Sequence, residues 1–227
     1  MNVRELEKKY CVDILISTRD RHSELYGLLV SLQYQTFQNF NILIRHESQT
    51  PLSTHYPTQI MINELKFQGH KVFLKDRQQS FGVCFSRNDL IKEHKNWKTG
   101  ANLVLRLDDD IILENTYIEK LLEGIEMDYD LMSGIISLAG QQKFERENRF
   151  IGKIINEHKL NEKGELILFK DDCGFCYLDN NQILPTHQFR TNCLMKTEVL
   201  EHCTYPTWIS HVGFREEGFF SFQAIIN

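Results

Sequence analysis

Three adjacent aspartates, Asp108–Asp110, are the residues whose type and spacing most strongly suggest chemistry. They directly follow the apolar stretch "NLVLRL", and a second apolar stretch begins at Ile111. Asp is a common turn residue, so a solvated turn is one interpretation of the pattern. Three neighbouring carboxylates also repel one another, and a hard divalent cation would offset that repulsion. The surrounding elements must decide between a turn and a cation site.

Other charged side chains could take part in the same chemistry. Glu216 and Glu217 open the last predicted helix, where a carboxylate could remove a proton from a substrate. Acidic residues in a first helical turn are also favoured by the helix dipole alone. Arg21 and Arg87 carry guanidinium groups whose geometry matches phosphate oxygens, although a single Arg is commonly a surface charge.

The first 140 residues alternate between predicted strands and predicted helices. Leu25, Leu28, Leu29 and Leu32 have helical spacing, with Ser23 or Asp20 as the candidate cap. Alternation of this kind predicts an α/β doubly wound fold with a mostly parallel central sheet flanked by helices. We predict strands at Cys11–Thr18, Phe40–Ile44, 70–75, 102–107 and 129–138, and helices at about 23–35, 61–67, 86–94 and 118–125.

The aspartates follow one of these strands, which changes how they are interpreted. Ligands of open α/β sheets bind outside the carboxyl ends of the strands. The loop after Thr18, the loop after Ile44 and Asp108–Asp110 all lie at such ends. The position therefore favours a cation site over a plain turn.

Composition limits the classes of function. The chain has 227 residues, enough for one sizeable domain with a real core. A net charge of −5 argues against non-specific binding to nucleic acid. No apolar stretch approaches the ~20 residues of a membrane span, and the N-terminus has no signal core. We therefore expect a cytoplasmic protein with reduced cysteines and no integral membrane segment.

The last third of the sequence is less regular. Residues 141–172 are charged and weakly patterned, which suggests a hairpin or a mobile segment over the site. His187–Met195 reads as a strand, "KTEVLEHC" as a short helix, and "GFREEGFFSFQAII" as the last helix.

In order along the chain, "STRDR", "QTFQNFNILI", "GVCFSRN", "LRLDDDI" and "REEGFFSF" resemble the motifs of family 2 glycosyltransferases. The similarity runs from about Val12 to Phe222. It implies the GT-A type, Rossmann-like fold of nucleotide-diphospho-sugar transferases. It also implies one domain over 1–227, with a nucleotide-sugar-binding half at 1–110 and an acceptor-binding half at 111–227.

The resemblance assigns residues to the donor. Thr18, Asp20 and Arg21 fall on the segment that lines the nucleotide pocket, and Arg87 falls beside the donor. The second strand of the family ends in an acidic pair that reads the nucleobase. Here His46 and Glu47 lie at or next to those positions, so Glu47 is a donor-binding candidate and the residue that meets the base stays open.

The resemblance also assigns the metal and the base. Asp108 and Asp110 match the Asp-x-Asp motif, in which the first residue faces the ribose and the second holds Mn²⁺ or Mg²⁺ on the diphosphate. Asp109 is expected to point away from the metal. Glu217 matches the catalytic base of inverting members, although the pair here is Glu-Glu rather than Glu-Asp.

The implied function is an inverting, metal-dependent transfer of a sugar from a nucleoside-diphosphate sugar, with a UDP-sugar favoured. The donor sugar would be a hexose or an N-acetylhexosamine. The acceptor would be a hydroxyl on a glycan, a lipid-linked molecule or another compound, in glycan or polysaccharide synthesis. A non-catalytic relative that binds sugar nucleotides or glycans is one alternative. A nucleotidyltransferase is another, but "STRDRHSELYG" lacks the Gly-rich phosphate loop that it would need.

Overall fold

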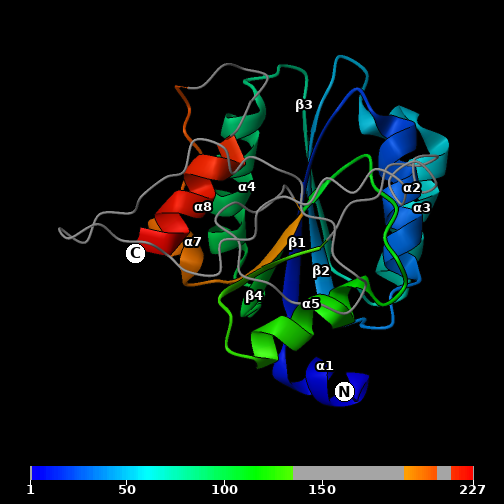
Figure 1. The fold of residues 1–227 in the computed structure, drawn as a ribbon. Helices are drawn as coiled ribbons and strands as arrows, with labels where there is room; N and C mark the ends of the chain where they lie inside the picture. The colour runs from blue at the N-terminus through cyan, green and yellow to red at the C-terminus, as the bar shows by residue number, and fades with distance from the viewer. Residues whose placement is uncertain (1, 135–191, 209–215, 227) are drawn as a thin grey trace, which may run out of the picture. The chain divides into compact units, whose positions relative to one another are not determined.

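The computed structural model describes residues 2–134, 192–208 and 216–226 (Figure 1). These residues all belong to one compact unit, formed by Met1–Gly134 and Gln188–Asn227. The segment predicted at 141–172, and the parts of the predicted strands that fall within 135–191, lie outside the described residues.

A central sheet organises the described part of the chain. Its strands lie in the order β3-β2-β1-β4-β6-β5. The first four strands pair in parallel, whereas β6 is antiparallel to both β4 and β5. The predicted mostly parallel sheet is therefore confirmed. The strands are β1 Val12–Arg19, β2 Phe40–Glu47, β3 Val72–Arg77, β4 Leu103–Asp108, β5 Leu131–Ser133 and β6 Cys193–Lys196.

Helices cover both faces of this sheet. Figure 1 shows α2 and α3 on one face and α4, α7 and α8 on the other. The helices are α1 Val3–Lys9, α2 His22–Gln33, α3 Tyr56–Phe67, α4 Val83–Trp97, α5 Tyr117–Glu126, α7 Val199–His202 and α8 Glu216–Ile226, with a 3₁₀ turn at Leu52–Thr54.

Three helix starts differ from the sequence predictions. Helix α4 begins at Val83, directly after its N-cap residue Gly82, rather than at about Ser86. Helix α3 begins at Tyr56 rather than near Met61, because Pro57 in the first turn needs no hydrogen-bond acceptor for its nitrogen. Helix α2 begins after Arg21, and neither Ser23 nor Asp20 caps it. Its N-cap residue is Arg21, which makes no side-chain cap hydrogen bond.

The parallel strands read as continuous apolar runs because both faces of the sheet are buried. Ile14 and Ile16 of β1 pack into the core that includes α2, α3 and α5. Leu15, between them, points to the other face and packs with residues of α4, α7 and α8. The alternation along β1 therefore divides the interior into two cores, one on each face.

A buried polar network fixes α4 against the sheet. Asp13 of β1 is 0% exposed, and it accepts hydrogen bonds from Asn41 Nδ2 at 2.8 Å and Thr99 Oγ1 at 2.7 Å. Its Oδ2 also lies 2.7 Å from Nδ1 of His94, near the end of α4. A buried carboxylate needs such partners, so this network determines where α4 lies on β1 and β2.

The strand order reverses between β1 and β4. The chain proceeds from β1 outward to β2 and β3, and then returns to the other side of β1 as β4. Ser17 lies beside Asp108 in this pairing. A reversal of this kind opens a crevice at the carboxyl ends of the two strands, which is where α/β sheets bind ligands. Among the described residues, no helix is long and apolar enough to span a membrane.

Candidate functional site

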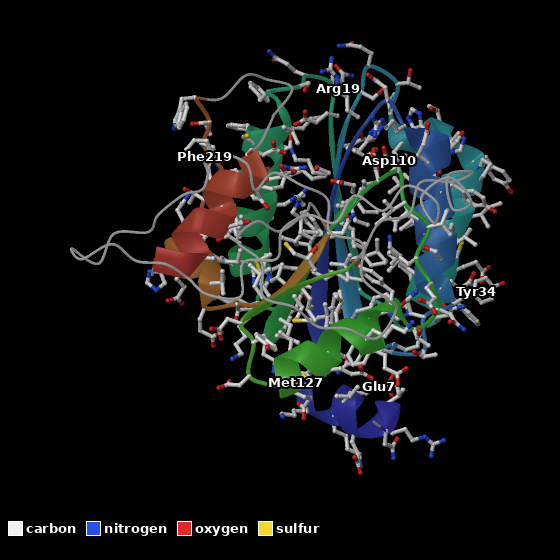
Figure 2. All side chains as sticks on the ribbon, in the orientation of Figure 1. Glu7, Arg19, Tyr34, Asp110, Met127 and Phe219 are labelled. Atoms are coloured by element: carbon white, nitrogen blue, oxygen red, sulfur yellow. The ribbon has the colours of Figure 1, made fainter. Side chains whose placement is uncertain are left out.

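The carboxyl edge of the sheet carries the charged residues selected from the sequence. Figure 2 shows Arg19 and Asp110 at this edge, and Glu7 and Met127 at the opposite end of the molecule. Asp108 is the last residue of β4, and Asp109 and Asp110 form the turn after it. The three aspartates therefore lie where the sequence placed them, but their side chains have different partners.

Asp108 faces two arginines. Its Oδ1 accepts hydrogen bonds from Arg106 Nη2 at 3.0 Å and from Arg87 Nη2 at 3.4 Å. The backbone N–H of Asp108 donates to Oδ1 of Asn192, which directly precedes β6, at 2.8 Å. Both guanidinium groups are buried, so this carboxylate is held firmly at the end of its strand.

Asp109 and Asp110 share a single arginine. Nη1 of Arg21 donates to Asp109 Oδ1 at 3.1 Å and to Asp110 Oδ2 at 2.7 Å. Asp109 is buried and Asp110 is half exposed. Burial raises the pKa of the Asp109 carboxyl, an effect that the nearby hydroxyl of Thr18 and the charge of Arg21 only partly oppose. Positive side chains thus offset the repulsion among the three aspartates.

Thr18, near the end of β1, and Asp20, directly after β1, have different surroundings. Thr18 is buried, and its hydroxyl lies next to Asp109 without forming a hydrogen bond of good geometry in the described part of the chain. Asp20 has φ 54°, in the left-handed region that a non-glycine residue seldom adopts. Its exposed carboxylate lies 3.7 Å from Nε of Arg19. The backbone at Asp20 therefore turns its side chain to Arg19, and Arg21 reaches the aspartates.

The two glutamates of α8 meet Arg87. Its Nη1 donates to Oε1 of Glu216 and, at 3.0 Å, to Oε1 of Glu217. Burial and a hydrogen bond to Glu217 raise the pKa of Glu216 to about 7, against the opposing charge of Arg87. Burial would also raise the pKa of Glu217, but the hydrogen bond from Glu216 and the charges of Arg87 and Arg106 lower it below the ordinary value. Between the pKa values of the two groups, the pair therefore holds a proton on Glu216 and a negative charge on Glu217.

Arg106 and Tyr205 complete this cluster, although the sequence analysis did not select them. Arg106 is 5% exposed, and its Nη2 lies 3.8 Å from Oε1 of Glu217. Its Nη1 donates to the hydroxyl of Tyr205 at 3.3 Å. The guanidinium groups of Arg87 and Arg106 both lie over the Tyr205 ring, at 5.3 and 5.5 Å from its centroid. An arginine inside the apolar run "LVLRLD" was a signal that could have found Arg106, because a buried Arg needs anionic partners.

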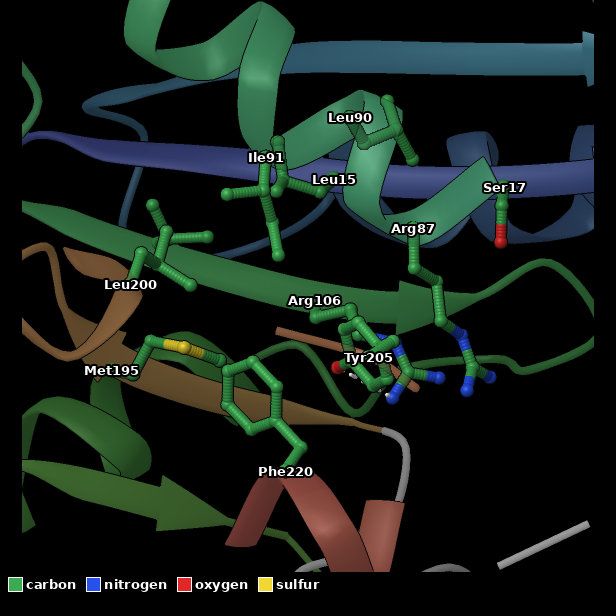
Figure 3. Close-up of a pocket in the computed structure, with 11 residues that line it drawn as sticks. Leu15, Ser17, Arg87, Leu90, Ile91, Arg106, Met195, Leu200, Tyr205 and Phe220 are labelled. Atoms are coloured by element: carbon green, nitrogen blue, oxygen red, sulfur yellow. Dashed lines mark hydrogen bonds between the residues drawn. The ribbon is translucent and has the colours of Figure 1, made fainter. Parts of the chain in front are cut away.

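A small cavity lies beneath the cluster, between α4, β1, β4 and β6 (Figure 3). Arg87, Arg106 and Tyr205 line its polar end. The remainder is mostly apolar, with Leu15, Leu90, Ile91, Val104, Met195, Leu200 and Phe220 around it. Its volume of about 10 Å³ is close to the minimum for one water molecule. The cavity is therefore too small for a sugar, and the apolar side chains around it pack beneath the charged cluster.

The end of β2 carries His46 and Glu47, which face opposite sides of the sheet. Glu47 is 3% exposed, and its Oε1 accepts hydrogen bonds from Ser86 Oγ at 2.6 Å and Arg45 Nε at 2.9 Å. Nδ1 of His46 lies 2.5 Å from Oδ1 of Asp76. Both side chains are buried, so the assignment of Glu47 to the nucleobase stays a prediction.

The oxygen ligands at this edge fit a hard divalent cation. Mg²⁺ and similar ions commonly take one or two protein carboxylates and complete their coordination with substrate phosphates and water. Asp110 is half exposed and meets that requirement. In the described ranges, no group of three or more His, Cys, Asp or Glu side chains could hold a metal ion alone. The residues present therefore suit a metal that is bound together with a phosphate-containing ligand.

No protein-family model and no curated protein sequence matches the chain. Solved structures do match, and three of them match over 94% of this chain. One is S. aureus TarS, with a TM-score of 0.61, 15% identity and 33% of that chain covered. The chain has the GT-A glycosyltransferase fold. At this level of identity the likeness shows the fold alone, and it confirms the fold that the sequence predicted.

Two further structures with the GT-A fold carry ligands. S. aureus TarS 1–349 in complex with UDP has a TM-score of 0.59, with 16% identity and 54% of that chain covered. A mannosyltransferase from Pyrobaculum calidifontis, PcManGT, in complex with GDP-Man and Mn²⁺ has a TM-score of 0.55, with 11% identity and 50% of that chain covered. The present chain thus spans between a third and about half of the length of these structures.

Proposed function

We propose that this chain is a glycosyltransferase that moves a sugar from a nucleoside-diphosphate sugar to a hydroxyl acceptor, with inversion at the anomeric carbon. One observation carries the proposal. Arg87, a buried residue of helix α4, contacts both Asp108 at the end of β4 and Glu217 at the start of α8. One buried guanidinium, that of Arg87, therefore contacts both Asp108, proposed for the donor, and Glu217, proposed for the acceptor.

The donor would bind at the aspartates. The two structural neighbours with ligands contain UDP, or GDP-Man with Mn²⁺, which supports a nucleoside diphosphate here. Asp110 would hold the Mn²⁺ or Mg²⁺ ion, with Asp108 beside it. Such an ion, when bound, supplies Lewis-acid stabilisation of the negative charge on the departing diphosphate. Thr18 and Arg21 would line the nucleotide pocket, and a UDP-sugar is the donor that we favour.

Glu217 would act as the general base. Its lowered pKa keeps the carboxylate ionised at neutral pH, whereas Glu216, whose pKa is raised to about 7, is the member of the pair that retains a proton to higher pH. An ionised carboxylate within hydrogen-bond reach of the acceptor hydroxyl removes its proton during attack. Attack on the side opposite the leaving group inverts the anomeric centre. Arg87 and Arg106 would orient Glu217 through their contacts with its Oε1.

The remaining assignments are part of the same proposal. The transferred sugar would be a hexose or an N-acetylhexosamine. The acceptor would be a hydroxyl of a glycan, a lipid-linked molecule or another compound, in the synthesis of glycans or polysaccharides. Acceptor recognition would involve the half of the chain after residue 111.

The test is a calorimetric titration of the full chain with UDP, GDP, dTDP and CMP, each with and without Mn²⁺. We expect metal-dependent binding of one nucleoside diphosphate, lost in Asp110→Asn. Glu123→Gln removes an equivalent charge at an exposed position of α5 and should leave binding unchanged. Binding of no nucleotide under any condition would contradict the transferase proposal. Metal-dependent binding without sugar transfer or donor hydrolysis would support a binding protein instead.

A further inference from the structure

Arg21 makes an unusual pair of contacts at the turn after β4. One nitrogen, Nη1, donates hydrogen bonds to both Asp109 Oδ1 and Asp110 Oδ2. Asp110 is the residue proposed above to hold the divalent ion, and its contact with Arg21 is the shorter, at 2.7 Å. A guanidinium therefore lies where the donor-bound enzyme would need a metal ion.

Two positive groups at one carboxylate oppose each other. Asp109 and Asp110 require a nearby cation because their charges repel, and Arg21 supplies it in the donor-free chain. A divalent ion at Asp110 would repel the guanidinium at short range. The ion and Arg21 are thus alternative cations for the same carboxylate.

The Arg21 side chain can move away from the aspartates more easily than the other arginines of the site can. Its side chain is 51% exposed, whereas those of Arg87 and Arg106 are 6% exposed. The ion pair between Arg21 and Asp110 joins two half-exposed side chains, and an ion pair in that setting contributes little to stability. Arg21 can therefore exchange one anionic partner for another at little cost, and the two buried arginines stay in place.

We propose that Arg21 is a place-holding cation, which neutralises Asp109 and Asp110 in the donor-free chain and transfers to the diphosphate when the metal arrives. The inference rests on the proposed function. It has two consequences of opposite sign. Arg21 weakens the binding of a metal ion alone, and it strengthens the binding of metal and nucleoside diphosphate together. A guanidinium that served only structure would not produce this pair of effects.

The test measures Mn²⁺ binding without nucleotide, by electron paramagnetic resonance of the free ion, in the full chain and in Arg21→Gln. We expect Mn²⁺ alone to bind about three- to tenfold more tightly in Arg21→Gln, because its competitor is gone. Binding of UDP or GDP in the presence of Mn²⁺ should weaken by a similar factor. Arg19→Gln is the matched control. It removes the same charge two residues earlier in the chain, and the Arg19 side chain is exposed and pairs with Asp20 instead of Asp110.

The outcomes distinguish failure of the place-holding role of Arg21 from failure of the proposed function. Equal Mn²⁺ affinities in Arg21→Gln and Arg19→Gln would overturn the place-holding role, even where the wild-type chain binds metal and nucleotide together. Arg21→Lys keeps the charge and should bind Mn²⁺ alone about as weakly as wild type; tightening equal to that of Arg21→Gln would also overturn it. Failure of the wild-type chain to bind any nucleotide with Mn²⁺ would contradict the proposed function itself.

Discussion

Nη1 of Arg87, on α4, donates a hydrogen bond to Oε1 of Glu217, on α8, at 3.0 Å. Through Nη2, the same guanidinium reaches Asp108, at the end of β4, at 3.4 Å. One buried cation thus joins three elements that are far apart in the sequence. Because a buried Arg is stable only with anionic partners, this contact fixes the separation of the two carboxylates.

Replacing Glu217 with Gln should abolish most turnover and spare donor binding. Gln keeps the size of the side chain but cannot accept the proton of the acceptor hydroxyl. Loss of a general base typically costs about 10²–10⁴ in rate. The measurement is the rate of sugar transfer or donor hydrolysis, with nucleotide affinity measured in parallel. Glu201→Gln, at an exposed position of α7, is the control. Unchanged turnover in Glu217→Gln would remove Glu217 as the base.

Glu216 should make stability fall as the pH rises from about 4.5 to about 7. Its ordinary pKa is 4.5, and burial raises it to about 7 in the folded chain. The folded state therefore binds more protons than the unfolded state within this window, and the free energy of unfolding decreases with pH. Glu217, whose pKa is lowered, acts in a separate window, because its contribution is lost only as the pH falls below 4.5.

The test of this pH dependence is urea unfolding of wild type and Glu216→Gln at pH 5, 6, 7 and 8. Gln resembles the protonated carboxyl, so the variant should gain stability relative to wild type as the pH rises. A difference that stays constant across this range would show that Glu216 does not titrate as described.

Replacing Arg106 with Met should destabilise the chain by about 3 kcal/mol, because Asp108 and Glu217 lose one of their two arginines. Arg106→Lys should lose less, since it keeps the charge and lacks only the planar fork. Chemical unfolding of both variants measures the effect, and Arg4→Met at an exposed position of α1 should change little. Equal stability of Arg106→Met and wild type would show that Arg87 alone is enough to neutralise Asp108 and Glu217.

Gly82, which precedes α4, should not tolerate a side chain. Its φ of 96° and ψ of 161° lie in a region that essentially only glycine adopts. Gly82→Ala should therefore cost about 1–3 kcal/mol in the free energy of unfolding and disturb the start of the helix that carries Arg87. Gln79→Ala, at an exposed position of the same loop, should stay within about 0.5 kcal/mol of wild type. A neutral Gly82→Ala would show that this turn can relax.

The fold could be predicted in large part because its signals are local. The apolar runs of β1, β2 and β4 and the leucine spacing of α2 each lie within one element. The start of α3 was misplaced because the apolar pattern becomes clear only after the proline turn. The missing cap of α2 was not predictable, since the chain at Asp20 takes a left-handed conformation that brings Arg21 to the helix start.

Of the candidate site, the sequence determined the positions of the aspartates and glutamates, because strand ends and helix starts follow from local periodicity. It also determined the number of negative charges that would need partners. Only the tertiary structure decided which cation serves which carboxylate: Arg21 for Asp109 and Asp110, and Arg87 with Arg106 for Asp108 and Glu217. The reason is physical. Burial and distance set both ion pairing and pKa, and each depends on residues that lie about 20 to 130 positions apart in the chain.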